Sequence, residues 1–261
     1  MRYLRLYLYF LRFSFSRAFE FRVDFWFRIF MDCVYYAVHL AFFTIIYARS
    51  GVIGGWTLDQ TYVFVCGFLL ADAIHMTVFA NNMWILPTFI NRGDLDYYLV
   101  RPVSSLYFLS VRDFAANSFI NVVIAGGLVA WSLARYPGGL GAGQITIFLL
   151  FILLGAFLTY LSRMLSVIPV FWLHSSRGLE ELYYTMDNMA ERPHQIFPRW
   201  LRYLVLSILP FAFVSSVPSH VLFEGLTMER FAHALLVTAG LFTAVRFAWK
   251  RGLGAYASAS S

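Results

Sequence analysis

Among the polar side chains inside apolar stretches of this sequence, five are candidates for chemistry, because a charge or an amide there needs a partner. Asp72 and His75 are three residues apart and share one helical face, and Asn117 and Asn121 are four apart on another. Arg163 lies in a third apolar run. Polar groups inside a membrane either mark a functional path or hold helices together by hydrogen bonding. We favour the second interpretation, because neither pair continues into a longer polar stripe.

The common catalytic and cofactor motifs are missing from the sequence. There is no G-x-x-x-x-G-K-[ST] loop for nucleotide phosphates, no H-E-x-x-H and no G-x-S-x-G. The histidines are scattered without the spacing of metal ligands, and Cys33 and Cys66 stand apart in apolar runs, as small packing residues do. We therefore expect this chain to bind no metal or cofactor and to have no enzyme activity by itself.

The composition is that of a membrane protein. Hydrophobic residues make up 60% of the 261 positions and charged residues only 13%, which is about half the charged share of a soluble domain. This excludes an ordinary soluble globule, and it also excludes disorder, which requires low hydrophobicity. The net charge of +6 fits cytoplasmic loops and contact with a lipid bilayer better than nucleic acid.

The order of apolar runs predicts an all-α integral membrane protein with six transmembrane helices. Residues 1–28 place arginines on one helical face and leucines on another, which indicates an N-terminal interfacial amphipathic helix. A helix needs about 20 apolar residues to cross the hydrocarbon. Runs long enough for this cover residues 29–48, 61–80, 113–134, 145–172 and 231–249.

The remaining span is ambiguous from the residues alone. Residues 201–222 are apolar but contain Pro210 and Pro218, whereas residues 176–197 carry several charges that a lipid-exposed helix would not tolerate. Hydropathy favours 201–222. Either choice puts both termini on the same side, and the excess of arginine in the terminal segments makes that side cytoplasmic.

The loop after the second span, residues 88–102, fits a short surface helix that begins after a glycine and ends before a proline. Asp94 and Asp96 would lie at its positive N-terminal end. Leu95 and Leu99 would give it an apolar side for docking. By its physical properties alone, this segment is a connector between two spans, with no indication of what it contacts.

The loop resembles the G-x-L-D/E-x-L-L-x-x-P-V-S loop of permeases of type-2 ATP-binding-cassette (ABC) exporters. In this sequence the corresponding coupling residues are Gly93, Asp94, Leu95, Asp96, Tyr97, Leu99, Arg101 and Pro102, followed by Val103 and Ser104. The P-x-x-I-F-P stretch at 193–198, the apolar segment 209–213 and the tail with Gly252 and Tyr256 resemble one branch of that family.

The resemblance implies a coupling helix seated in a cleft of a separate ABC ATPase subunit, which would bind ATP and Mg. It implies a dimer with a second permease copy or a related permease, export from the cell, and a cytoplasmic (inner) membrane location. It also implies that residues 176–197 form the fifth span and that residues 201–222 form a re-entrant extracytoplasmic helical hairpin. The broken, proline-containing segment 201–222 suits burial within protein.

With that topology, charged residues of 176–197 join the intramembrane polar residues as candidates for the lining of a pathway or dimer interface. The candidates are Asp72, His75, Asn117, Asn121, Arg163, Glu180, Glu181, Asp187 and Asn188. Rival functions stay open: a secondary transporter, which should show inverted repeats, and a structural membrane protein with no nucleotide partner. An intramembrane enzyme would need a clustered catalytic set, which the sequence lacks. The transported substrate is not indicated.

Overall fold

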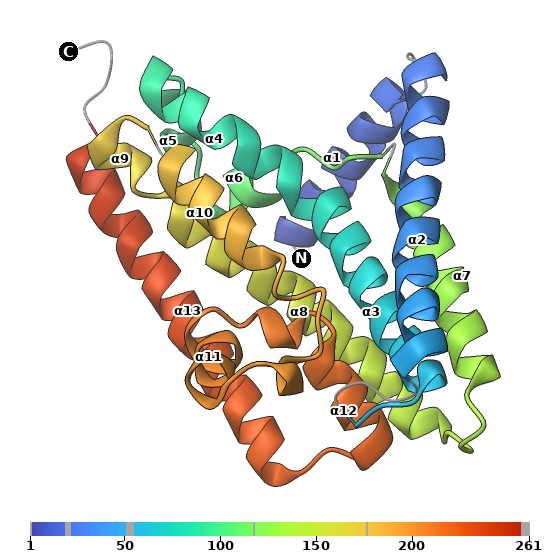
Figure 1. Cartoon of the computed structure of the whole chain (residues 1–261). Helices are drawn as coiled ribbons and strands as arrows, with labels where there is room; N and C mark the ends of the chain where they lie inside the picture. The colour runs from blue at the N-terminus through green and yellow to red at the C-terminus, as the bar shows by residue number, and fades with distance from the viewer. Residues whose placement is uncertain (1, 19–21, 51–54, 117, 176, 257–261) are drawn as a thin grey trace.

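The computed structural model describes five stretches of the chain, and every element in them is helical (Figure 1). These stretches are residues 2–18, 22–50, 55–116, 118–175 and 177–256. Within them, four helices are long and apolar enough to cross a membrane: Ile29–Arg49, Leu58–Arg92, Ala142–Leu173 and Met228–Ala255. The expected all-α membrane protein is confirmed, whereas the count of six spans and the re-entrant hairpin stay predictions.

Two helices form the N-terminal part, α1 (Arg2–Ala18) and α2 (Arg22–Ser50). Leu8 and Phe13 of α1 are exposed, which fits a helix whose apolar face lies on lipid. α2 also exposes many apolar side chains along its length. α2 begins at Arg22, but its part that is apolar and long enough to cross a membrane is Ile29–Arg49. The boundary expected at residue 28 between the interfacial helix and the first span stays a prediction.

A long helical rod forms the centre of the bundle. It consists of α3 (Leu58–His75), a π-helical turn η1 (Met76–Ala80) and α4 (Asn81–Arg92). Thr57 caps its start, because its side chain accepts a hydrogen bond from the backbone of Gln60 while the Gln60 side chain accepts one from Thr57. Gly93 ends it in the left-handed conformation, with φ of 79°. The rod therefore continues past residue 80, where the sequence places the end of the second span.

The third span begins later than expected. Residues Ser105–Val111 form the short helix α6, and α7 covers Phe119–Arg135 rather than starting at residue 113. The buried side chain of Asn82 holds the intervening backbone: its Nδ2 donates to the Asp113 carbonyl at 2.9 Å, and its Oδ1 accepts from the Asp113 N–H at 2.8 Å. Since Asn82 satisfies both backbone groups, the chain can leave the helical conformation here without orphaned polar groups.

Helix α8 (Ala142–Val167) packs against the rod, against α12 and against α13. A turn containing Pro169 separates it from α9 (Val170–Leu173). Gly155 allows the closest approach, because a Cβ at this position would lie 2.9 Å from the Cα of Val214. The segment around Val214 is thus pressed directly on the helix backbone.

Short helices occupy the region between α9 and the last long helix. They are α10 (Arg177–Asp187), the 3₁₀ turn η2 (His194–Ile196), α11 (Arg199–Tyr203), the π turn η3 (Leu204–Ile208), the 3₁₀ turn η4 (Phe211–Phe213) and α12 (Ser216–Glu224). The last helix, α13, covers Met228–Ala255. Neither 176–197 nor 201–222 is one continuous helix, since the first is helical mainly up to Asp187 and the second is interrupted at Pro210. The choice of the fifth span stays a prediction.

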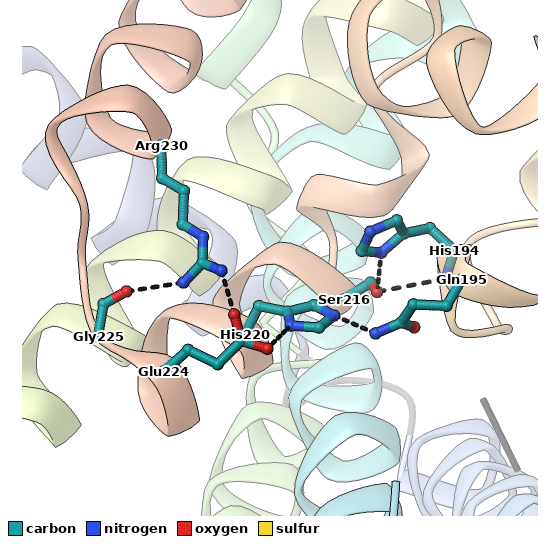
Figure 2. Close-up of polar contacts among 7 residues, drawn as sticks. All are labelled: His194, Gln195, Ser216, His220, Glu224, Gly225 and Arg230. Carbon is teal, nitrogen blue, oxygen red and sulfur yellow. Dashed lines mark hydrogen bonds and ion pairs between the residues drawn. The ribbon is translucent and has the colours of Figure 1, made fainter. Parts of the chain in front are cut away.

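Polar contacts hold this region together at one end of the bundle, as Figure 2 shows. The backbone N–H of His194 donates to Ser216 Oγ at 3.3 Å, which joins η2 to α12. Glu224, at the end of α12, accepts hydrogen bonds from His220 and from Arg230 of α13. Partial burial raises the pKa of the Glu224 carboxyl, but the hydrogen bonds from Arg230 and His220 outweigh it and the net shift is downward.

The coupling loop lies at the opposite end of the bundle, close to the C-terminal end of α13. Trp249 Nε1 of α13 donates to Ser105 Oγ at 3.2 Å. Tyr107 of α6 donates to the backbone carbonyl of Tyr3 at 3.2 Å, which brings α1 onto the same short helix. The helix that follows the loop, α6, therefore contacts parts of both terminal helices.

Candidate functional site: a polar cavity and a coupling loop

A cavity of about 870 Å³ lies between α2, the rod, α7, α8 and α10, and we call it the central cavity. Its charged and amide lining residues are Asp32, Asp72, Asn81, Asn121, Arg163, Asp187, Asn188 and Glu191. Aromatic side chains, among them Tyr35, Tyr36, Trp84 and Tyr184, form much of the remaining wall. Its size lies within the range of pockets that hold small organic molecules, about 300–1,000 Å³.

Arg163 of α8 is the centre of the polar contacts beside this cavity. It is buried, and its Nη1 lies 3.1 Å from His75 Nε2 on α3. Its Nη2 donates to an Asp187 carboxylate oxygen on α10 at 3.3 Å. Since a guanidinium only donates hydrogen bonds, the contacting nitrogen of His75 is the acceptor, and His75 is neutral in this arrangement. Arg163 thereby joins three helices that are far apart in the sequence.

Stacking adds a third kind of contact to Arg163. The guanidinium lies 4.5 Å from the centre of the Tyr184 ring and 5.7 Å from that of Tyr183. Trp84 Nε1 donates to the Tyr184 hydroxyl at 2.9 Å, which links α4 to α10 at the edge of the cavity. A cation over an aromatic face is attracted by the ring quadrupole, so these rings help to hold the buried charge.

The other polar residues form separate contacts around the cavity. Asn121 of α7 donates from Nδ2 to Asp32 of α2. His39 Nε2 lies 3.7 Å from a Glu191 carboxylate oxygen. Asp72 makes no hydrogen bond or ion pair with any residue that the structure describes, although it lines the cavity.

The structure brings together most of the polar residues that the sequence singles out. Asp72, Asn121, Arg163, Asp187 and Asn188 line the central cavity, and His75 contacts it through Arg163. Asn117 lies outside the described residues. Glu180 and Glu181 do not line the cavity; they lie beside a shallow hollow on α10, together with Arg177. His75 therefore fits the interpretation that these polar residues hold helices together by hydrogen bonding. Asp72 instead faces the central cavity.

Four charged or polar cavity or rim residues were not selected from the sequence: Asp32, His39, Asn81 and Glu191. Asp32 lies in the first apolar run and carries the same signal as Asp72, a carboxylate among apolar neighbours. Glu191 belongs to the charged part of 176–197. Nothing in the spacing could pair them with Asn121 or His39, because these contacts join different helices. No group of three or more His, Cys, Asp or Glu side chains in the described residues is arranged to hold a metal ion.

The segment that resembles a coupling helix contains a short helix, α5 (Asp96–Leu99). It begins two residues later than the predicted helix, so Asp94 lies before it. Asp94 and Pro102 are exposed around it. The guanidinium of Arg101 lies 4.4 Å from the centre of the Tyr97 ring, which steadies the end of the loop. Burial and the negative charge of Asp96 raise the pKa of the Tyr256 hydroxyl, so the end of α13 lies close to this helix.

One expectation about the loop is corrected by burial. Leu95 was expected to form a docking face with Leu99, but it is fully buried in the core of the chain. The apolar side chains that the loop exposes are Tyr97, Leu99 and Val100. Leu95 is therefore an anchor that fixes the loop to the bundle, and the other three form its accessible tip.

Comparison with known proteins identifies one family. The family model described as ABC-2 family transporter protein matches residues 33–260. No curated protein and no solved structure matches the chain. The matched range includes the central cavity, the coupling loop and the C-terminal helix.

We expect Arg163→Leu to lower the free energy of unfolding by about 3 kcal/mol, because it leaves the Asp187 carboxylate and His75 without their shared donor. Arg135→Leu is the matched control. Its ion pair with Asp59, at 2.8 Å, lies on an exposed face and is worth at most about 1 kcal/mol. Chemical unfolding of the purified chain in detergent measures both variants, and equal losses would contradict a central role for Arg163.

Proposed function

The chain belongs to the ABC-2 transporter family and is a permease component of an ABC transporter, and we propose that it forms half of a dimeric exporter driven by a separate ATPase. The second half is another copy of this chain or a related permease. The ATPase subunits bind ATP and Mg, and this chain supplies the membrane path. The observation that carries the proposal is the exposed apolar tip of the coupling loop, anchored in the core by Leu95.

The geometry of the loop supports transmission of force from an ATPase. Tyr97, Leu99 and Val100 offer a small apolar surface to a partner cleft. Behind them, Leu95 packs in the core and the Arg112 guanidinium contacts the Tyr98 hydroxyl. A movement of the tip therefore passes to α4 and α6 instead of being absorbed by the loop. Coupling needs such a two-state element biased by nucleotide.

The central cavity supports a pathway along α2, the rod and α10. We propose that Asp72, Asn121, Arg163, Asp187 and Asn188 face the transported molecule or the dimer interface. α10 is a good candidate for the moving wall, because most of its side chains are exposed and, within the described ranges, Tyr183 is its one buried residue.

The proposed topology places each segment relative to the membrane. The coupling loop and both termini are cytoplasmic, α1 lies on the inner surface of the cell membrane, and residues 176–197 cross as the fifth span. Residues 201–222 then form the re-entrant hairpin on the outer side. Their interruption at Pro210 and their close packing on Gly155 support burial within protein rather than a crossing of their own.

We expect Leu99→Asp to release the ATPase or to uncouple ATP hydrolysis from transport, because a charge at the tip cannot enter an apolar cleft without losing its hydration. The control is Leu226→Asp. Both leucines are 39% exposed, but Leu226 lies in the loop between α12 and α13 at the opposite end of the molecule. Co-purification of the ATPase with each variant measures the effect. If both variants retain ATPase binding and transport, the coupling assignment is wrong.

For the topology, we expect Arg199→Cys to react with a membrane-impermeant maleimide from outside the cell. Arg199 is exposed, whereas Arg202 is less suitable because its guanidinium donates to the carbonyl of Gln195 at 2.7 Å. The background carries Cys33→Ser, since Cys33 is exposed. Val100→Cys should react only from the cytoplasm. Cytoplasmic labelling of Arg199→Cys would instead make 201–222 the fifth span.

A further inference from the structure

Carboxylates outnumber basic groups in the described lining of the central cavity. Beside Asp32, which accepts from Asn121, the lining contains the carboxylates of Asp72, Asp187 and Glu191 but, in the described part of the chain, a single guanidinium, that of Arg163. The carboxylates of Asp187 and Glu191 lie near Arg163 and His39, respectively. Asp72 has no ion pair or hydrogen bond with the residues that the structure describes. A carboxylate in this setting is stabilised most effectively by a positive charge that enters the cavity.

A second polar group of the cavity also requires a donor. Asn121 is buried, and its Nδ2 donates to Asp32. Its Oδ1 is buried without a hydrogen-bond partner within the described ranges. A buried acceptor left without a donor is destabilising. Asp72 and Asn121 Oδ1 are both acceptors, whereas the buried Arg163 Nε is a donor without a partner in the same described ranges.

The aromatic wall suits the same kind of ligand. Tyr35, Tyr36, Phe68 and Trp84 line the cavity, and aromatic faces attract cations. The chain already holds one cation in this way, because Arg163 lies between the Asp187 carboxylate and the Tyr184 ring. A cation from outside would meet the same pair of groups, a carboxylate and aromatic faces, around Asp72.

We propose that the central cavity binds an organic cation with apolar groups, such as a protonated lipophilic amine, with Asp72 facing its charge, its N–H groups as donors and the aromatic wall facing its apolar part. As an assignment of cargo, this rests on the proposed function, in which the cavity is the transport pathway. The binding itself requires only this chain.

The test compares two probes of similar shape and opposite charge, tetraphenylphosphonium and tetraphenylborate. Equilibrium binding of each is measured on the full chain in lipid nanodiscs, with empty nanodiscs subtracted. We expect tetraphenylphosphonium to bind and Asp72→Asn to weaken it at least about ten-fold, as expected for loss of one charged contact. Asp59→Asn, an acidic residue paired with Arg135 outside the cavity, should leave the affinity unchanged.

Equal binding of the anion and the cation to the unmodified chain would overturn the proposal, and so would unchanged cation binding to Asp72→Asn. The comparison of the two probes needs no variant, so it decides the question even if Asp72→Asn does not fold. The complex with its ATPase in proteoliposomes separates the two proposals. Cation binding without ATP-driven transport would contradict the exporter alone, whereas ATP-driven transport by a complex that binds no cation would contradict the cationic cargo alone.

Discussion

A guanidinium inside an apolar bundle must keep its hydrogen bonds and a counter-charge, because removing one partner of a buried ion pair costs about 3–5 kcal/mol. The Nη1 and Nη2 groups of Arg163 meet this constraint through His75 and Asp187, and Tyr184 lies against the guanidinium. Its buried Nε has no partner among the residues that the structure describes. The three contacting residues come from α3 and α10, so one side chain of α8 fixes both elements at a single point. The central cavity lies beside this point, and its shape depends on where α10 is held. If α10 moves, Arg163 must break its hydrogen bond to Asp187 and form another. This favours two discrete positions of α10 over a continuous range.

The rod from Leu58 to Arg92 connects the cavity with the coupling loop. Asp72 lies on its cavity-lining part and Gly93 directly follows its end, a separation of about 30 Å along a helix axis. The π-helical turn at Met76–Ala80 interrupts the regular hydrogen bonding next to the cavity, and such turns are frequent at functional sites. A displacement of the loop therefore reaches the cavity through the rod alone. The π-helical turn is a local irregularity of the rod beside the polar residues of the cavity.

Sequence patterns predict much of this arrangement, and the exceptions have physical reasons. The apolar runs locate the long helices, and Gly93 and Pro102 bracket the short helix α5, since both act through the local backbone. The late start of α7 depends on Asn82, whose hydrogen bonds to Asp113 join distant residues. The polar pairs look isolated along the chain because a helical face shows only contacts at three or four residues. Their meeting around Arg163 depends on tertiary contacts between different helices, and the burial of Leu95 depends on such contacts too.

Access to the cavity during ATP turnover tests the central claim most directly. Asn188 directly follows α10, is exposed and lines the cavity. A cysteine at this position (Asn188→Cys, in a background with Cys33→Ser) therefore reports on the accessibility of this wall. In sealed proteoliposomes that contain the ATPase, we expect trapping with ATP and vanadate to change the rate of labelling by an impermeant maleimide several-fold. The change should disappear when Leu99→Asp is added. A labelling rate that is the same with and without trapped nucleotide would contradict a pathway at this cavity that the ATPase opens and closes.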